Sequence, residues 1–307
     1  MVKHVTLQYG YNSLVEQGEM QYIELGVFKG KAGDTFAWNT EDCEAVLVFL
    51  SGRCRLRVNG EQYPVVGGRR SVFEGNAWSL YAPNGTQVEI EVLDEAEVAV
   101  SKTRVTTDAM PKLIPPEEVN VRDVGVWNWR RDVKDIVDKR TPAARLLVGE
   151  TINPPGNWSS WPPHKHDVHD PPGEVDLEEI YYYKVNRPEG YAIQRVYTRD
   201  RRIDQTLTVR DGELVLIPEG YHPVVAAHGY DVYYLNALAG SARSMAASDD
   251  PDYAWVRQTW RDQEQKKFSE EFAQQLQSLS KFIELIDRHI PYLARKAEII
   301  EEYLQHR

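Results

Sequence analysis

Short stretches of alternating polar and apolar residues, separated by glycine and proline turns, run along most of this 307-residue chain. Between residues 43 and 60, three arginines alternate with apolar residues before an Asn59-Gly60 turn, which is a strong hairpin signal. A second turn, at residues 83–85, is followed by valine and isoleucine alternating with glutamate. Because such alternation buries one face of a strand and exposes the other, it predicts an all-β sandwich or barrel.

The same pattern returns in the second half of the chain. Residues 178–198 contain strand-like runs of tyrosine and isoleucine, and a Pro-Glu-Gly turn follows at 218–220. When this turn is aligned with the Pro-Asn-Gly turn at 83–85, His222 falls on Gln87. The repetition predicts two similar β-barrels in tandem.

The chain therefore divides into three predicted parts. Residues 1–110 form the first barrel, and residues 111–260 form the second, after a connection that prolines keep irregular. Residues 261–307 contain no glycine, a single proline and many strong helix formers, so they are predicted to be a helical tail.

Apolar residues of this tail repeat at alternating intervals of three and four, which is the seam of a coiled coil or helical hairpin. They are Leu276, Leu279, Ile283, Ile286, Ile290, Leu293, Ala297, Ile300 and Leu304. Pro291 interrupts the run and predicts a kink or two shorter helices. The tail either packs on its own barrel or mediates oligomerisation, and a catalytic role is the third alternative.

The charge balance limits the partners of the chain. There are 36 Lys plus Arg against 47 Asp plus Glu, which gives a net charge of −11. A negative net charge repels nucleic acids and anionic membranes, so neither is expected as a partner. Cys43 and Cys54 are too few for a disulfide framework and are expected to be reduced thiols. No apolar run suits a signal peptide or a membrane span, which predicts a cytoplasmic location.

Histidines are concentrated in one part of the chain. Five of the eight lie between residues 164 and 228. Residues two apart in a strand share a face, so His164 and His166 can reach one ion. Glu179 begins the next apolar run and His222 follows a turn, so three strands can converge. Three imidazoles and one carboxylate suit a divalent zinc, manganese, iron, cobalt or nickel ion with an open position for catalysis.

These residues also fit the two-motif signature of the cupins, which is Gly, His-x-His, Glu and Gly, then Gly, Pro-x-Gly and His. The matching positions are Gly156, His164, His166, Glu179, Gly190, Gly212, Pro218, Gly220 and His222. The chain departs from the signature in two places. An insert lengthens the gap between His166 and Glu179, and one residue rather than two separates Gly220 from His222.

Longer stretches make the resemblance more specific. They are LLVGETINPPGNWSSWPPHKHD, LEEIYYYKVN, GYAIQRVYT and IPEGYHPVVAAHGYDVYYLNALAG. Together they resemble the 5-deoxy-glucuronate isomerase family of bacterial inositol catabolism, over residues from about 20 to 260. The resemblance implies two tandem cupin barrels of jelly-roll type, with the helical tail outside the shared part.

By this similarity, the ligands of one divalent metal ion are His164, His166, Glu179 and His222. Zinc and manganese are favoured, and iron, cobalt and nickel stay open. Glu178 is the rival for the carboxylate position. Glu179 shares a strand face with Tyr181 and Tyr183, and the related ketol-isomerases place the ligand directly before an apolar-aromatic run, which favours Glu179. The first barrel lacks the histidines and is expected to bind no metal.

The resemblance implies an aldose-ketose isomerase that converts 5-deoxy-D-glucuronate into 5-dehydro-2-deoxy-D-gluconate while the metal polarises the carbonyl. The base that moves the proton is Glu178, a tyrosine such as Tyr181 or Tyr183, or a metal-bound hydroxide. Candidates for holding the sugar acid are Lys165, Gln194, Arg195 and His228. His169 is expected to be a solvated loop residue.

Two other functions remain open from the sequence. Histidine-rich cupin sites that bind iron also serve dioxygenases. A cupin that binds a sugar without converting it is the second alternative, because the first barrel lacks metal ligands and the chain carries an extra tail. A homo-oligomer is expected, since oligomers are common for barrels of this kind.

Overall fold

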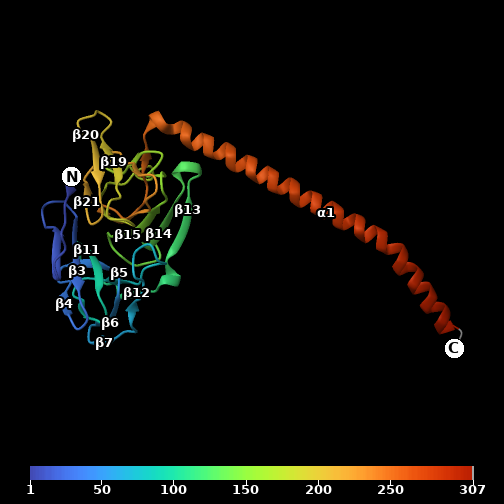
Figure 1. Ribbon diagram of the computed structural model, residues 1–307, viewed down its shortest axis with the longest axis horizontal. Helices are drawn as coiled ribbons and strands as arrows, with labels where there is room; N and C mark the ends of the chain where they lie inside the picture. Colours follow the sequence, from blue (N-terminus) through green and yellow to red (C-terminus); the bar gives the residue numbers. More distant parts are fainter. Residues whose placement is uncertain (306–307) are drawn as a thin grey trace. The chain divides into compact units, whose positions relative to one another are not determined.

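The computed structural model describes residues 1–305, without the side chains of 260–265 and 302–303. Residues 1–254 form one compact unit of antiparallel β-sheets, and helix α1 (Ala254–Gln305), from Trp255 onward, forms a second unit. The predicted all-β fold with a C-terminal helical extension is confirmed (Figure 1).

The first half of the compact unit contains a large and a small sheet. The large sheet has the order β12 (Lys112–Ile114), β9 (Ser79–Ala82), β5 (Cys43–Ser51), β11 (Ala96–Arg104), β3 (Ile23–Gly30) and β2 (Gly10–Val15). The small sheet has the order β4 (Thr35–Asn39), β10 (Gln87–Val92), β6 (Arg53–Val58) and β7 (Glu61–Gln62), and β8 (Val66–Gly67) pairs with β6. Strand β6 carries the predicted alternation, with its arginines exposed and Cys54, Leu56 and Val58 buried.

The second half repeats this arrangement. Its large sheet has the order β1 (Val2–Lys3), β21 (Leu214–Ile217), β18 (Leu177–Val185), β23 (Val232–Gly240), β15 (Leu147–Asn153), β14 (Arg131–Val137) and β13 (Asn120–Val124). Its small sheet has the order β16 (Trp158–Ser159), β22 (Val224–Ala226), β19 (Ala192–Tyr197) and β20 (Asp204–Val209). Two short strands, β17 (His164–Lys165) and β24 (Ser248–Asp249), pair separately. Single 3₁₀ turns occupy Pro116–Glu118, Trp127–Trp129 and Pro251–Tyr253.

The two large sheets face each other, so the central strands are buried on both sides. In β5, Leu47 and Phe49 pack inside the first barrel, whereas Val46 and Val48 pack in the core between the two large sheets. In β18, Tyr181 and Tyr183 point into the second barrel, and Ile180 and Tyr182 into the shared core. Burial on both faces explains why these strands are nearly continuous apolar runs in the sequence.

Because the shared core unites both halves, residues 1–254 are one compact unit. The N-terminal strand β1 pairs with β21, so the first residues of the chain complete the sheet of the second half. The division into domains at residue 110 stays a prediction. Cys43 and Cys54 are both free and buried, as expected for thiols.

Two glutamates connect the halves in a reciprocal manner. Strands β5 and β18 both have nine residues, and each has a glutamate at its second position. The carboxylate of Glu44 accepts hydrogen bonds from the backbone amides of residues 144–146, each at 2.7 Å. The carboxylate of Glu178 accepts hydrogen bonds from the amides of residues 21–23, at 2.5 to 2.8 Å. Each half therefore supplies the acceptor for three amides of the other half.

Helix α1 continues through Pro291 as one helix of 52 residues. The alternative of two shorter helices is therefore wrong, and Figure 1 shows a helix that curves toward its C-terminal end. Among the described residues, no helix has both the length and the apolarity needed to cross a membrane.

Replacing Glu178 by glutamine tests the reciprocal anchors. The amide nitrogen of glutamine cannot accept a hydrogen bond, so at least one backbone N–H loses its partner. We expect Glu178→Gln to lower the free energy of unfolding by roughly 1–3 kcal/mol in urea titrations. Glu89→Gln, on an exposed carboxylate of β10, is the control and is expected to change stability by less than about 0.5 kcal/mol. Equal stability of the two variants would contradict this role.

Candidate metal centre

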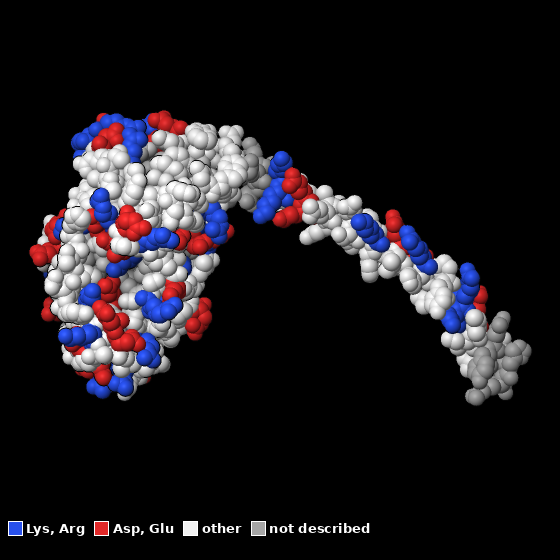
Figure 2. Space-filling model, in the orientation of Figure 1, with Lys and Arg blue, Asp and Glu red and all other residues white. Residues whose placement is uncertain are grey.

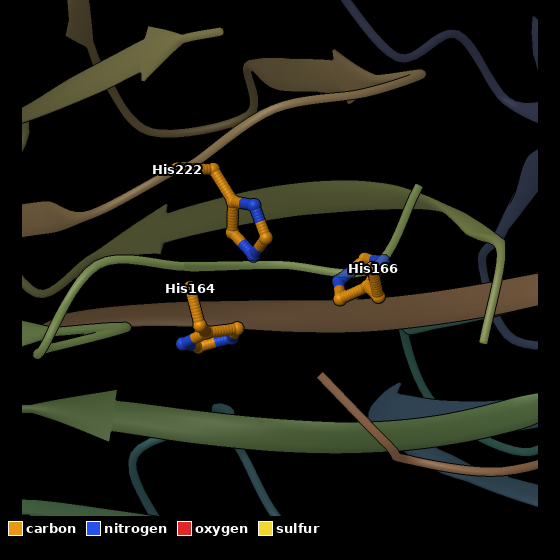
Figure 3. Close-up of side chains that lie close together, drawn as sticks. All are labelled: His164, His166 and His222. Atoms are coloured by element: carbon orange, nitrogen blue, oxygen red, sulfur yellow. The ribbon is translucent and has the colours of Figure 1, made fainter. Parts of the chain in front are cut away.

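Three histidines come together inside the second barrel (Figure 3). His164 lies in β17, His166 follows this strand, and His222 lies between β21 and β22. Their metal-binding nitrogens all lie within 4.8 Å of one another. His166 and His222 are buried, whereas His164 is half-buried, so the cluster is most accessible on the side of His164.

Backbone carbonyls orient the three rings. Nδ1 of His166 lies 2.7 Å from the carbonyl oxygen of Leu177, and Nδ1 of His222 lies 2.9 Å from that of Gly220. Nδ1 of His164 lies 3.4 Å from the carbonyl oxygen of Pro162. A proton on Nδ1 that is donated to a carbonyl leaves Nε2 with a free lone pair, as a metal ligand requires.

Glu179 lies beside this cluster. Its Oε2 atom is 3.2 Å from Nε2 of both His166 and His222. Burial alone raises the pKa of the Glu179 carboxyl, but the contacts with the two histidines outweigh burial and lower this pKa to about 2. The same contact raises the pKa of His166 against the effect of burial. Burial, and then the charges of His222 and His166, lower the pKa of His164 well below its ordinary value.

The donor set fits a divalent transition metal. Nε2 of His222 is fully buried, and its 3.2 Å contact with Oε2 of Glu179 does not have the geometry of a hydrogen bond, so a bound ligand would satisfy this nitrogen better. Three imidazole nitrogens with an adjacent carboxylate suit zinc, manganese or iron. The residues that can hold such an ion are His164, His166, His222 and Glu179.

The insert between His166 and Glu179 stabilises the cluster. Glu174 accepts hydrogen bonds at 2.8 Å from the backbone amides of Asp167 and Val168. Asp167 in turn accepts a hydrogen bond at 2.7 Å from the amide of Gly220, two residues before His222. The insert therefore joins the His164–His166 segment to the turn that carries the third histidine.

The alternation of β18 separates the catalytic candidates. Tyr181 and Tyr183 lie on the same side as Glu179, and the ring centroids of Tyr181 and His222 are 5.9 Å apart. Glu178 lies on the opposite side, where its carboxylate is bonded to the amides of residues 21–23. The structure thus brings Tyr181 to the histidines, places Tyr183 beside Tyr181, and does not bring Glu178 there.

The two tyrosines keep their protons at neutral pH. Burial, and next the negative charge of Glu179, raise the pKa of Tyr181 well above its ordinary value. Burial is also the main cause that raises the pKa of Tyr183. The hydroxyl of Tyr181 is hydrogen-bonded to Ser160 at 2.9 Å, and that of Tyr183 donates to Gln194 at 2.9 Å. Both are therefore proton donors rather than ready bases.

The predicted substrate-binding residues have different positions. Gln194 is buried next to the cluster, and its Nε2 donates to the carbonyl oxygen of His222 at 3.4 Å. Lys165 is paired with Asp167 and Glu174, and Arg195 is paired with Asp204 on the neighbouring strand β20. His228 is exposed in a turn. The structure therefore brings one of the four candidates, Gln194, to the histidines.

His169 is exposed in the insert, as expected, and its ring contacts Asp176. In the first half, Gln87 is also exposed. Ala45 occupies the third position of β5, where β18 has Glu179. The interior of the first barrel is filled by apolar side chains such as Leu47 and Phe49.

Sequence reasoning missed Arg131, at the start of β14. Its Nη1 atom donates to the carbonyl oxygens of Trp129 at 3.2 Å and Trp161 at 3.3 Å. Its positive charge contributes, after burial and the other histidines, to the lowered pKa of His164, and it also acts on Tyr234. The guanidinium therefore contacts the segment that leads to His164, through the carbonyl oxygen of Trp161. The arginine pair at 130–131 before an alternating strand is a weak signal that no local motif strengthens.

Comparison with known proteins identifies the family. A sequence profile described as the KduI/IolB family matches residues 5–256. The chain belongs to the KduI/IolB family. The resemblance to 5-deoxy-glucuronate isomerases is confirmed, and helix α1 lies almost entirely outside the matched residues.

Two relatives within the KduI/IolB family show the extent of the similarity. The 5-deoxy-glucuronate isomerase of Geobacillus thermodenitrificans (strain NG80-2) is 41% identical over 245 residues, which cover 80% of this chain and 89% of the relative. That of Geobacillus kaustophilus (strain HTA426) is 42% identical over 240 residues, which cover 78% and 87%. Both relatives are isomerases by name, and this KduI/IolB member is an enzyme of the isomerase class.

Solved structures support the fold of this family member. An IolB-like protein from Salmonella typhimurium LT2 is similar with a TM-score of 0.81 and 33% identity, covering 83% of this chain and 98% of that one. Oxalate decarboxylase from Lactobacillus farciminis has a TM-score of 0.58 at 11% identity, covering 80% and 86%. The second similarity concerns the fold alone and supports the predicted cupin architecture.

Metal analysis tests the histidine cluster directly. After equilibrium dialysis against Zn²⁺ or Mn²⁺, we expect one bound ion per chain by elemental analysis, and a higher melting temperature by mass action. His222→Ala is expected to weaken metal binding at least tenfold. Loss of a group that only supports a metal ligand costs about tenfold in affinity, and loss of the ligand itself should cost no less. His228→Ala removes an exposed histidine of the same half and is expected to bind as wild type. Equal metal content in the two variants would refute the site.

Proposed function

We propose that this protein is an aldose-ketose isomerase that converts 5-deoxy-D-glucuronate into 5-dehydro-2-deoxy-D-gluconate. The observation that carries the proposal is the convergence of His164, His166 and His222 beside Glu179 in a chain whose relatives bear the name of this isomerase. In the reaction, the aldehyde carbon gains a hydrogen and becomes a hydroxymethyl group. The neighbouring carbon loses its hydrogen and becomes a ketone, so no external oxidant is needed.

A divalent metal held by the three histidines and Glu179 would polarise the substrate carbonyl and stabilise the negative charge that develops on oxygen. Zinc and manganese are the ions that we favour. His164 is half-buried and His166 and His222 are buried, so a substrate would approach from the side of His164.

Tyr181 is the residue that we propose for proton handling at a substrate oxygen. Its ring lies against His222, and its raised pKa keeps the hydroxyl protonated at neutral pH. The hydrogen bond to Ser160 fixes the direction of this hydroxyl. A neutral phenol beside a polarised oxygen can donate a hydrogen bond that strengthens as negative charge develops.

Arg131 is the residue that we propose for holding the carboxylate of the sugar acid. A guanidinium binds a carboxylate through two parallel hydrogen bonds, which fixes the orientation of the other end of the substrate. The Arg131 side chain is itself held by the carbonyl oxygens of Trp129 and Trp161. Trp161 lies three residues before His164, so the carboxylate would bind beside the loop that carries His164.

We also propose that the reaction is part of inositol breakdown and takes place in the cytoplasm, and the similarity to the 5-deoxy-glucuronate isomerases supports this proposal. The free, buried state of Cys43 and Cys54 agrees with a reducing compartment. We further propose that the protein acts as a homo-oligomer on a small sugar acid.

Proton NMR in D₂O tests the reaction. With metal-loaded protein and 5-deoxy-D-glucuronate under argon, we expect loss of the aldehyde-hydrate signals and appearance of the hydroxymethyl ketone. Conversion without oxygen would exclude a dioxygenase, and conversion itself would exclude a protein that only binds sugars. The His222→Ala variant is expected to be inactive. No conversion by the metal-loaded wild type would overturn the substrate, and full activity of the metal-free protein would overturn the role of the metal.

Replacing Arg131 tests the carboxylate clamp. Loss of a charge-assisted hydrogen bond costs about 1.5–3 kcal/mol, so Arg131→Gln is expected to raise KM roughly tenfold to a hundredfold while metal content stays at the wild-type level. Arg195→Gln is the matched variant, because this arginine is paired with Asp204. A rise in KM for Arg195→Gln alone would assign the clamp to Arg195. A loss of metal in Arg131→Gln would mean that Arg131 supports the loop of His164 instead.

A further inference from the structure

Helix α1 carries an apolar stripe that is independent of the isomerase site. From Phe272 to Leu304, apolar residues occupy positions three and four apart without interruption. The members of this seam are Phe272, Leu276, Leu279, Ile283, Ile286, Ile290, Leu293, Ala297, Ile300 and Leu304. A strict repeat of this kind matches the surface of another helix, since knobs from one seam fill the holes of the other.

The features that would disturb a seam lie away from it. Pro291 is seven residues from both Glu284 and Glu298, so these three residues lie on one polar side of the helix. Lys281 and Arg288 also lie outside the seam positions. The proline therefore changes the backbone of α1 without removing an apolar layer.

The charge of α1 argues against a membrane surface as its partner. Residues 266–301 contain six Lys or Arg and six Asp or Glu. Figure 2 shows basic and acidic side chains next to each other along the visible side of α1. Helices that bind anionic membranes carry an excess of basic residues, which this helix does not have. A balanced helix instead fits a partner with the same balance, as a second copy of this chain provides.

The length of the seam also favours a helix as the partner. Its 33 residues span about 50 Å at 1.5 Å per residue. A domain of 254 residues has a radius of gyration of roughly 18 Å, so its convex surface can follow a helix of this length only in part. A second α1 has the same length and the same repeat, and can follow the seam from end to end.

The apolar face is wider than the seam itself. Phe282 lies beside the seam, and its side chain is 59% exposed; Leu285 and Ile299, 54% and 59% exposed, lie farther round the helix. A continuous exposed apolar surface is unfavourable in water unless another molecule or segment covers it. We propose that α1 is the assembly element of this protein and joins copies of the chain through a helical coiled coil or bundle. This inference rests on α1 alone and does not depend on the proposed reaction.

Sedimentation of the full-length protein tests this proposal. At micromolar concentration we expect wild type to sediment as an oligomer. A variant with Ile283→Glu and Ile290→Glu places charges in the seam and is expected to have at most half of the wild-type mass. The control carries Gln274→Glu and Gln277→Glu, which add the same charge on the polar side of α1, and is expected to keep the wild-type mass.

Three results would overturn the proposal. A monomeric wild type would mean that the seam is covered by the chain's own barrels or by another partner. An unchanged mass of the seam variant would mean that the barrels assemble without α1. Equal dissociation of the seam variant and the control would mean that added charge, rather than the seam, controls assembly. Thermal unfolding of residues 1–254, followed by tyrosine and tryptophan signals, checks that the variants remain folded.

Discussion

Strand β18 is buried on both faces, and much of the molecule depends on this constraint. Its odd-numbered residues, Glu179, Tyr181 and Tyr183, point into the second barrel, and its even-numbered neighbours point toward the first half. A shift of one residue in the register would exchange the two sets. The carboxylates and tyrosine hydroxyls on each side would then lose their present partners. Pairing with β21 and β23 fixes the register on both edges. The same strand thus places the candidate metal carboxylate and joins the halves.

The two halves use the same architecture for different purposes. The first barrel has Ala45 at the position of Glu179, and an apolar interior. The second buries two imidazoles and a carboxylate and partly buries a third imidazole, which is costly for folding when no metal balances them. Burial of ionisable side chains is typical of functional sites, and its cost in folding free energy is offset by other parts of the fold. The apolar first barrel and the core between the large sheets are the parts that can offset them.

Local patterns in the sequence were sufficient for the strands, the repeat and the histidine cluster. Alternation in residues 53–58 predicted β6, and the spacing of His164 and His166 predicted two rings on one side. Strand parity placed Glu178 and Glu179 on opposite faces, and the resemblance to related isomerases favoured Glu179 for the side of the histidines. These features depend on periodicity, which a single sequence contains.

Other features depend on contacts between distant segments. Glu178 was a candidate base, but its carboxylate is bonded to amides that lie more than 150 positions earlier in the chain. Arg131, in strand β14, contacts the loop of Trp161, which lies 30 residues later in the chain. No local pattern records such encounters, so the sequence alone left them out. Lys165 and Arg195, in contrast, pair with carboxylates that lie only two and nine residues later.

The reciprocal bonds of Glu44 and Glu178 have a consequence for how such a protein can evolve. After a barrel is duplicated, one copy is free to lose its metal ligands, as Ala45 and Gln87 illustrate. It is not free to be deleted, because the remaining copy would keep three amides without an acceptor and a large apolar sheet without cover. The surface of the first barrel thus gives a reason to retain it that is independent of any chemistry.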